Sequence, residues 1–288
     1  MPDLPIVDTH VHMWDPNVLD YAWHANFPEF QKPHVFAAFD AARGPVEVEQ
    51  IVFLECLSNY ERSLDELAWV SSLWDQDERL AAIIPSADLA RGEGIRSVLA
   101  SIAENPYVPG IRRLIQEEPD IDFCIGDDFV KGVSMLAEFD LHFEICIYHP
   151  QLANAIRLAQ RCPEVRFILD HIGKPGIKEG LFEPWGHQMK ELAGLPNVWC
   201  KISGVTTEAD HDRWTREDLK PYIEHVIDCF GFDRIMFGGD WPVATWASDY
   251  PQWVETLDWV VEGATAEEKR KLYCDNAVGF YRLDRNRG

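Results

Sequence analysis

Short apolar runs alternate with amphipathic segments eight times along this chain, and this alternation restricts its fold more than any other feature. Most runs are continuously apolar, which is typical of parallel strands buried on both faces. The expected strands span residues 6–11, 50–56, 80–85, 110–116, 142–148, 165–171, 198–203 and 234–240. The expected helices span residues 59–74, 94–103, 127–139, 152–161, 185–193, 217–230, 250–261 and 266–281.

This pattern predicts a single domain over residues 1–288, folded as an α/β (β/α)8 TIM-type barrel in regular or distorted form. A doubly wound sheet is the alternative, but it normally carries a glycine-rich phosphate turn after an early strand, and we find none. The aromatic stretch from Trp14 to Phe39 shows no clear period and predicts a long loop after the first strand. Such a loop could cover a pocket, or it could pack on the outer surface.

The charge balance restricts the partners of the chain. It has 26 basic and 49 acidic residues, a net charge of −23, whereas nucleic-acid binding needs clustered Lys and Arg. We therefore expect neither nucleic acid nor a membrane, and no apolar run reaches the roughly 18 residues of a membrane span. No signal segment precedes the first strand, so a cytoplasmic location is expected. The expected partner is a small molecule, and a homo-oligomer remains open.

The first expected strand ends in the sequence from Asp8 to His12, which contains a His-x-His pair. Side chains two residues apart share a face of a strand, so Ile6, Asp8, His10 and His12 are expected to point the same way. Two imidazoles at this spacing can reach one metal ion or one substrate together. The motif is short, and alone it also fits an inert hydrogen-bonded pair.

Polar residues stand at the end of nearly every expected strand. In a barrel these ends converge on one face, where active sites lie. Each residue has a structural explanation of its own, such as a salt bridge or a cap, but their shared placement favours a catalytic face. The residues are His10, His12, Glu55, Arg112, Arg113, His149, His171, Lys201, Ser203 and Asp240.

Several of these segments resemble motifs of the amidohydrolase superfamily, and within it those of the amidohydrolase-related lactonases. The resemblance spans the whole chain and is carried by the order and spacing of the motifs. Its segments are Asp8 to His12, Gly110 to Gln116, Asp170 to Pro175, Phe237 to Pro242 and Asn276 to Leu283. The subgroup it resembles contains L-fuconolactonase, L-rhamnono-γ-lactonase and pyrone-dicarboxylate lactonase, and Trp14-Asp15-Pro16 with Tyr21-Ala22-Trp23 favours its sugar-lactonase members.

The resemblance implies a carboxylic ester hydrolase of carbohydrate metabolism that opens a sugar-acid lactone, similar to L-fucono- or L-rhamnono-lactone. Asp240 would be the general base that activates water, with His171 and Arg112 as further catalytic residues. His10, His12 and Asp240 would hold one divalent ion, zinc or manganese. An Arg stands where a two-metal centre needs a bridging Lys or Glu, so a binuclear site is not expected. Catalysis without a metal stays open.

The same resemblance places other residues at the substrate. Arg112, His149 and Lys201 are expected to hold its polar groups. Arginine suits a carboxylate better than lysine does, because its planar guanidinium can donate two parallel hydrogen bonds. Tyr21 and Trp23 are expected to stack on the sugar.

Two other functions remain open at this point. A metal-dependent non-oxidative decarboxylase of the same superfamily would share the barrel, the histidines and the aspartate, and it would release carbon dioxide. A non-catalytic barrel that binds a ligand should lack a complete polar constellation. The joint presence of His10, His12, His171 and Asp240 weighs against that second function.

Overall fold

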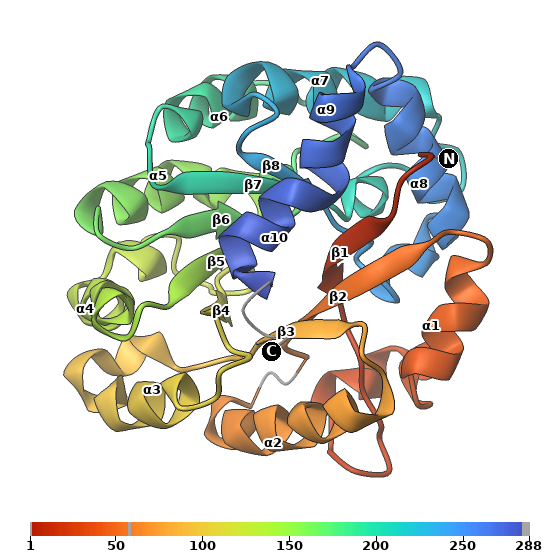
Figure 1. Cartoon of the computed structure of the whole chain (residues 1–288). Helices are drawn as coiled ribbons and strands as arrows, with labels where there is room; N and C mark the ends of the chain where they lie inside the picture. Colours follow the sequence, from red (N-terminus) through yellow and green to blue (C-terminus); the bar gives the residue numbers. More distant parts are fainter. Residues whose placement is uncertain (1, 57–58, 284–288) are drawn as a thin grey trace.

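The computed structural model describes residues 2–56 and 59–283 and shows eight parallel strands arranged around a central axis (Figure 1). Hydrogen bonding is continuous within β1-β2-β3 and within β4 to β8. Single parallel bridges, Ser86 to Arg112 and Val11 to Trp241, join the two groups and close the barrel. The strands are β1 (Ile6–Val11), β2 (Val48–Leu54), β3 (Leu80–Ile84), β4 (Gly110–Leu114), β5 (His142–Cys146), β6 (Phe167–Leu169), β7 (Val198–Ile202) and β8 (Ile235–Phe237). The expected (β/α)8 barrel is confirmed, in a distorted form with two weak seams.

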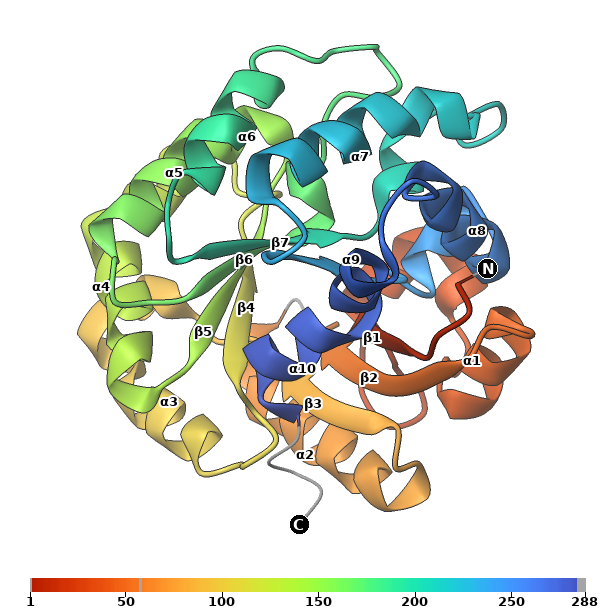
Figure 2. The same ribbon diagram turned by 45° about the horizontal axis from the view of Figure 1, so that its top comes forward.

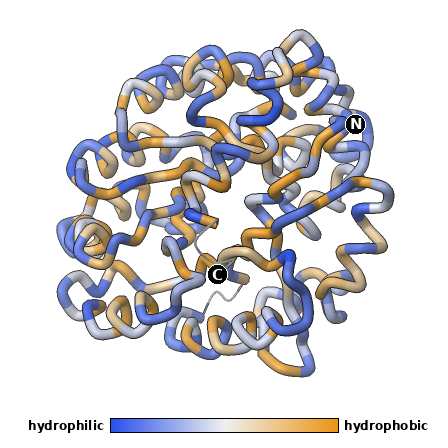
Figure 3. Tube along the Cα trace, viewed as in Figure 1, coloured by the Kyte–Doolittle hydropathy of each residue, from blue (hydrophilic) through white to orange (hydrophobic). Residues whose placement is uncertain are grey.

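The helices form the outer layer around the barrel, as the second view shows (Figure 2). Hydrophobic and hydrophilic residues alternate along them (Figure 3), as expected where one face of a helix packs on the strands. The helices are α1 (Phe36–Arg43), α2 (Ser63–Leu73), α3 (Arg96–Ala103), α4 (Asp127–Met135), α5 (Leu152–Arg161), α6 (Trp185–Ala193), α7 (Arg216–Phe230), α8 (Tyr250–Val260), α9 (Ala266–Arg270) and α10 (Asn276–Tyr281). None of those within residues 2–56 and 59–283 is both long and apolar enough to cross a membrane.

Two helical segments differ from expectation. Helix α1 begins inside the stretch that was expected to be a loop. Its two buried aromatic residues, Phe36 and Phe39, are three residues apart, and so short a period does not stand out in a sequence rich in aromatic residues. The expected helix over residues 266–281 is present, but a π-helical turn at Lys271–Asp275 separates α9 from α10.

Helix α10 fills the end of the barrel at which the strands begin. Phe280 and Tyr281 pack there with the inward-facing apolar side chains of several strands, among them Val7 and Met236. The ring of His142, at the start of β5, contacts both aromatic rings. Since this end is filled by side chains, a ligand can reach the interior only from the carboxyl ends of the strands.

The segment after β1 packs mainly on itself at the carboxyl end of the barrel. Trp14, Tyr21 and Phe30 form a small apolar cluster, against which Trp246 from the loop after β8 also packs. The indole of Trp23 donates a hydrogen bond to the carbonyl of Cys56 at 2.9 Å. The long loop expected here is confirmed from Trp14 to the start of α1.

A bulge in β1 changes which side chains face inward. Between Asp8 and Val11 the strand advances three residues while β2 advances two, from Ile51 to Phe53. Ile6 and Asp8 consequently face the helices, and the carboxylate of Asp8 accepts a hydrogen bond from Tyr250 of α8 at 2.7 Å. The expectation that Ile6 and Asp8 share a face with both histidines was therefore wrong, because one extra residue reverses the alternation of a strand.

Candidate active site

Asp240 lies at the centre of a group of three imidazoles at the carboxyl ends of β1, β6 and β8. Its Oδ1 is 3.7 Å from Nε2 of His10 and 3.6 Å from Nε2 of His12, and its Oδ2 is 4.0 Å from Nδ1 of His171. All four side chains are almost fully buried. The structure thus brings together four residues that lie up to 230 positions apart in the sequence, as the strand-end pattern predicted.

Neighbouring groups determine the orientation of two of these rings. The Nδ1 of His12 lies 3.0 Å from the carbonyl of Leu54, which can only accept, so Nδ1 carries a proton and Nε2 is the nitrogen that faces Asp240. The Nδ1 of His171 lies 3.0 Å from the hydroxyl of Ser203. Each ring is therefore held before any ligand binds.

The backbone is strained where it presents the site. His171 and Asp240 have φ angles of 54° and 53°, in the left-handed region that residues other than glycine rarely adopt. Between them lies Gly204, also left-handed at φ 57°. A Cβ on Gly204 would stand 2.5 Å from Nδ1 of His171 and 2.7 Å from Oδ2 of Asp240. Only glycine lets this turn approach both side chains.

Arg112 is buried beneath the imidazoles, and each of its terminal nitrogens already has a partner. Its Nε and Nη2 donate to the side chain and the backbone carbonyl of Glu55, both at 2.9 Å. Its Nη1 lies 3.0 Å from Nε2 of His10 and 3.4 Å from the carboxylate of Asp170. This guanidinium is therefore well placed to act on His10. It has no pair of free N–H groups with which to bind a carboxylate of the substrate.

Lys201 is fully buried and belongs to a second layer of charges below the site. Its Nζ forms salt bridges with Glu144 and, at 3.2 Å, with Asp170, and it lies 3.4 Å from Nδ1 of His10. Tyr281 of α10 donates a hydrogen bond to the same Glu144 at 2.9 Å. The expected contact of Lys201 with substrate is therefore corrected: its charge is neutralised inside the barrel, where it orients His10 and Asp170.

The protonation of the group follows from burial and from its charges. Burial lowers the pKa of His171 to about 4 and that of His10 well below its usual range. Burial alone would raise the pKa of Asp240, but the facing His171, His12 and His10 more than offset this and lower it. At neutral pH, His171 and His10 are neutral and Asp240 is a carboxylate.

The donors of His10, His12 and Asp240 fit one divalent metal ion. Nε2 of His12 and Oδ1 of Asp240 face each other at 3.6 Å, so one cation between them could bind both. The ligand atoms of the three residues lie within 4.8 Å of one another, and nitrogen and oxygen donors of this kind suit zinc or manganese. His10, Asp170 and His171 form an overlapping second set.

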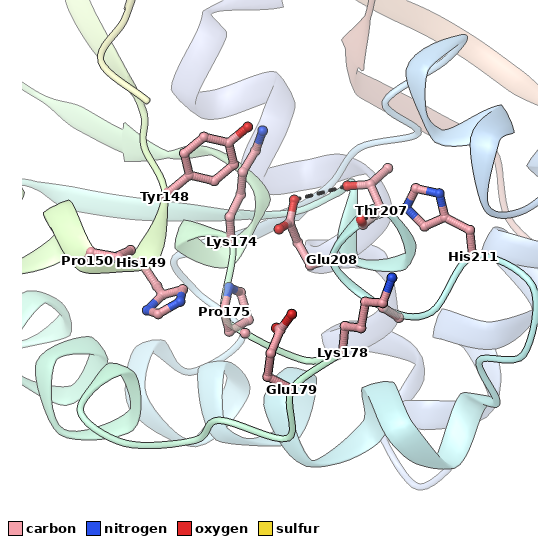
Figure 4. A pocket seen from close by; sticks show the side chains of 12 residues that line it. Tyr148, His149, Pro150, Lys174, Pro175, Lys178, Glu179, Thr207, Glu208 and His211 are labelled. Atoms are coloured by element: carbon pink, nitrogen blue, oxygen red, sulfur yellow. Dashed lines mark hydrogen bonds between the residues drawn. The ribbon is translucent and has the colours of Figure 1, made fainter. Parts of the chain in front are cut away.

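A cavity of ≈ 520 Å³ lies between the loops that follow β5, β6 and β7 (Figure 4). None of the four side chains of this group lines it, but the charge of Asp240 acts on Lys174 and Glu208 in its wall. Lys174 belongs to the same turn as His171, and Glu208 belongs to the turn that begins at Gly204. The expected substrate residue His149 lines this cavity and is half-buried. A volume of this order suits a small organic molecule.

The two aromatic residues expected at the substrate do not line this cavity. Tyr21 is 3% exposed and stacks on His24 inside the aromatic cluster, so neither face of its ring is free for a sugar. The expectation for Tyr21 is corrected for this reason. Trp23 is half-buried in the same cluster and packs edge-on against Trp14.

Sequence reasoning missed Glu144 and Asp170 as partners of the site, and it missed Glu208 as part of the cavity. A signal existed for the first two: a charged residue inside a continuously apolar strand, or directly at its end, has to be paired when the strand is buried. Glu208 lies in a loop with no such pattern, and only the fold brings it near Lys174.

Similarity to known proteins agrees with this geometry. An L-fucono-1,5-lactonase from Burkholderia ambifaria is 28% identical over 98% of this chain and 97% of its own length. An L-rhamnono-γ-lactonase from Scheffersomyces stipitis is 21% identical over 98% of this chain and 100% of its own. A zinc-bound amidohydrolase from Burkholderia multivorans has a similar structure, with a TM-score of 0.86 at 26% identity over 97% of this chain and 100% of that protein. The model of the amidohydrolase family matches residues 7–283, and the chain therefore belongs to the amidohydrolase family.

Proposed function

We propose that this enzyme hydrolyses a sugar-acid lactone, similar to L-fucono- or L-rhamnono-lactone, to the corresponding aldonic acid. The observation that carries the proposal is the ionised Asp240, held among three imidazoles at the carboxyl ends of the strands. The lactonases at 21–28% identity over nearly the whole chain support the choice of an ester ring as the substrate.

In the proposed reaction Asp240 takes a proton from water, and the resulting hydroxide attacks the lactone carbonyl. The ring C–O bond of the tetrahedral intermediate then breaks, and Asp240 returns the proton to the departing ring oxygen. Asp240 has a low pKa, but its neighbour His12 orients the water, and holding the reactants together supplies much of the rate enhancement.

His171 is the proposed donor to the developing oxyanion. When Ser203 donates its hydroxyl hydrogen to Nδ1, the proton of this neutral imidazole is on Nε2, from which it can donate to the carbonyl oxygen. Arg112 stabilises the negative charge from below through His10. His149, which lines the cavity, is the proposed substrate contact among the residues expected from the sequence.

A divalent ion on His10, His12 and Asp240, when bound, would act as a Lewis acid and lower the pKa of its water. The relative with bound zinc supports a metal-binding site of this kind.

The test is a pH-indicator assay of acid release over a panel of sugar lactones, with and without a chelator. We expect rapid hydrolysis of at least one lactone, and a decrease in kcat of roughly 10²- to 10⁴-fold in Asp240→Asn, because the general base is lost. Asp249→Asn is the matched control, since it changes a nearby aspartate that caps α8 and Asn caps equally well. Absence of acid release from folded protein would contradict the proposal, and carbon dioxide release from a hydroxybenzoate would favour the decarboxylase instead.

A further inference from the structure

Two opposite charges face the cavity without forming an ion pair with each other. The ammonium of Lys174 donates a hydrogen bond to Oε1 of Gln116 at 2.6 Å and lies 5.1 Å from the ring of Tyr148. The carboxylate of Glu208 accepts a hydrogen bond from the hydroxyl of Thr207 at 3.2 Å. Figure 4 shows both side chains directed into the space between the loops.

Both groups keep hydrogen-bonding capacity for a ligand. Burial raises the pKa of Glu208, and the charge of Lys174 partly offsets this. Burial opposes the charge of Lys174, but Cys146, Glu208 and Asp240 nevertheless raise its pKa. Within residues 2–56 and 59–283, neither Lys174 nor Glu208 takes part in a salt bridge, so ammonium hydrogens and carboxylate lone pairs are left over.

The two cations buried beneath the imidazoles are already neutralised. Arg112 is bound to Glu55 and Asp170, and Lys201 to Glu144 and Asp170. A carboxylate or sulfonate on the substrate would therefore meet Lys174 and the exposed Lys178, which line the cavity together with Glu208.

We propose that Lys174 and Glu208 form a hydroxyl-binding pair that selects neutral polyhydroxylated lactones over lactones that carry a carboxylate or sulfonate. This inference rests on the proposed lactonase function and specifies its substrate class. A hydroxyl group both donates and accepts, so two neighbouring hydroxyls satisfy the carboxylate and the ammonium together. An anionic group can only accept, and Glu208 repels it at short range in a half-buried site.

Glu208→Gln is the decisive variant, because it keeps the shape of the side chain and removes its charge. For a neutral hexono-lactone we expect kcat/KM to fall roughly 10- to 100-fold, mainly through KM, because a hydrogen bond to a charged group is lost. For a lactone with a carboxylate substituent we expect kcat/KM to rise. Glu191→Gln, on the exposed face of α6 and outside the cavity, should change neither value.

Lys174→Gln should give a different result from Glu208→Gln. It should weaken the binding of both substrates, since the neutral one loses a charged donor and the anionic one loses a half-buried cation. A Glu208→Gln variant that lowers kcat for both lactones equally, or that leaves the preference unchanged, would overturn the inference.

Binding to Asp240→Asn separates this inference from the proposed reaction. Calorimetry with a neutral sugar lactam, an analogue that resists hydrolysis, should show weaker binding when Glu208→Gln is added to Asp240→Asn. Hydrolysis by the wild type with no effect of Glu208→Gln refutes the hydroxyl-binding pair alone. No hydrolysis of any lactone by the wild type, with the lactam effect intact, refutes the reaction alone.

Discussion

Nη1 of Arg112 lies 3.0 Å from Nε2 of His10, the same nitrogen that faces Oδ1 of Asp240 at 3.7 Å. A neutral imidazole nitrogen without a proton has one lone pair, so Nε2 can accept a hydrogen bond from Arg112 or bind a metal ion, but not both. Arg112 therefore competes with any metal ion for His10.

This competition predicts that weakening the Arg112 contact strengthens zinc binding. Arg112→Lys retains a cation for the buried Glu55 and Asp170 but removes the fork that reaches His10. We expect one zinc ion per chain in both proteins and a lower Kd in the variant, measured by calorimetry with zinc alone. Arg113→Lys is the control on the same strand, since Arg113 pairs with Glu118. Equal zinc affinity in Arg112→Lys and the wild type would show that the arginine does not compete.

The close approach of Gly204 predicts a loss of activity on adding a single methyl group. Gly204→Ala should displace His171 or Asp240, because the new Cβ would lie under 3.0 Å from both. Gly231→Ala is a matched control, with φ of 64° and no atom within 4 Å of the added Cβ. Both variants should lose about 1 kcal/mol or more of stability from backbone strain, but only Gly204→Ala should lose activity. The combination of urea unfolding with the lactonase assay tests this, and comparable kcat values in the two variants would contradict it.

The buried charges around Lys201 predict a large loss of stability. Lys201→Met leaves Glu144 and Asp170 without a cation, and removing one partner of a buried pair costs about 3–5 kcal/mol. The half-exposed pair of Lys220 and Glu224 on α7 offers the control, because Lys220→Met should cost only about 0.3–0.5 kcal/mol. The test compares the free energies of unfolding in urea of Lys201→Met, Lys220→Met and the wild type. A small loss for Lys201→Met would mean that Glu144 and Asp170 accept protons instead.

The aromatic cluster predicts a pH dependence of stability. Burial lowers the pKa of His24 to about 4, whereas in the unfolded chain this residue titrates near its ordinary value of 6.5. Between these values the unfolded state binds a proton that the folded state does not, so stability should fall as the pH is lowered from 6.5 towards 4. His24→Phe should reduce this slope, measured as the shift of the urea midpoint with pH. His187→Phe, at an exposed position of α6, should retain more of it. Parallel acid losses in His24→Phe and the wild type would exclude His24 as a source.

Local patterns in the sequence were sufficient for the barrel and for the centre of its site. Continuous apolar runs identify buried parallel strands whatever their partners, and the carboxyl ends of such strands meet on one face of a barrel. That rule predicts that His10, His12, His171 and Asp240 lie together, and the distances among them agree.

The tertiary structure decided which of the other polar residues face a ligand. Asp8 turned outward because β1 pairs with β2 through a bulge, and register depends on the partner strand. Lys201 looked like a substrate residue in its own strand, but Glu144 and Asp170 arrive from β5 and the end of β6 to neutralise it. Tyr21 is enclosed by loop residues, and Glu208 meets Lys174 only where two loops converge. Burial and charge pairing depend on residues far away in the chain, and for this physical reason the sequence alone determined the fold and the central aspartate with its histidines, while the cavity was decided by tertiary contacts.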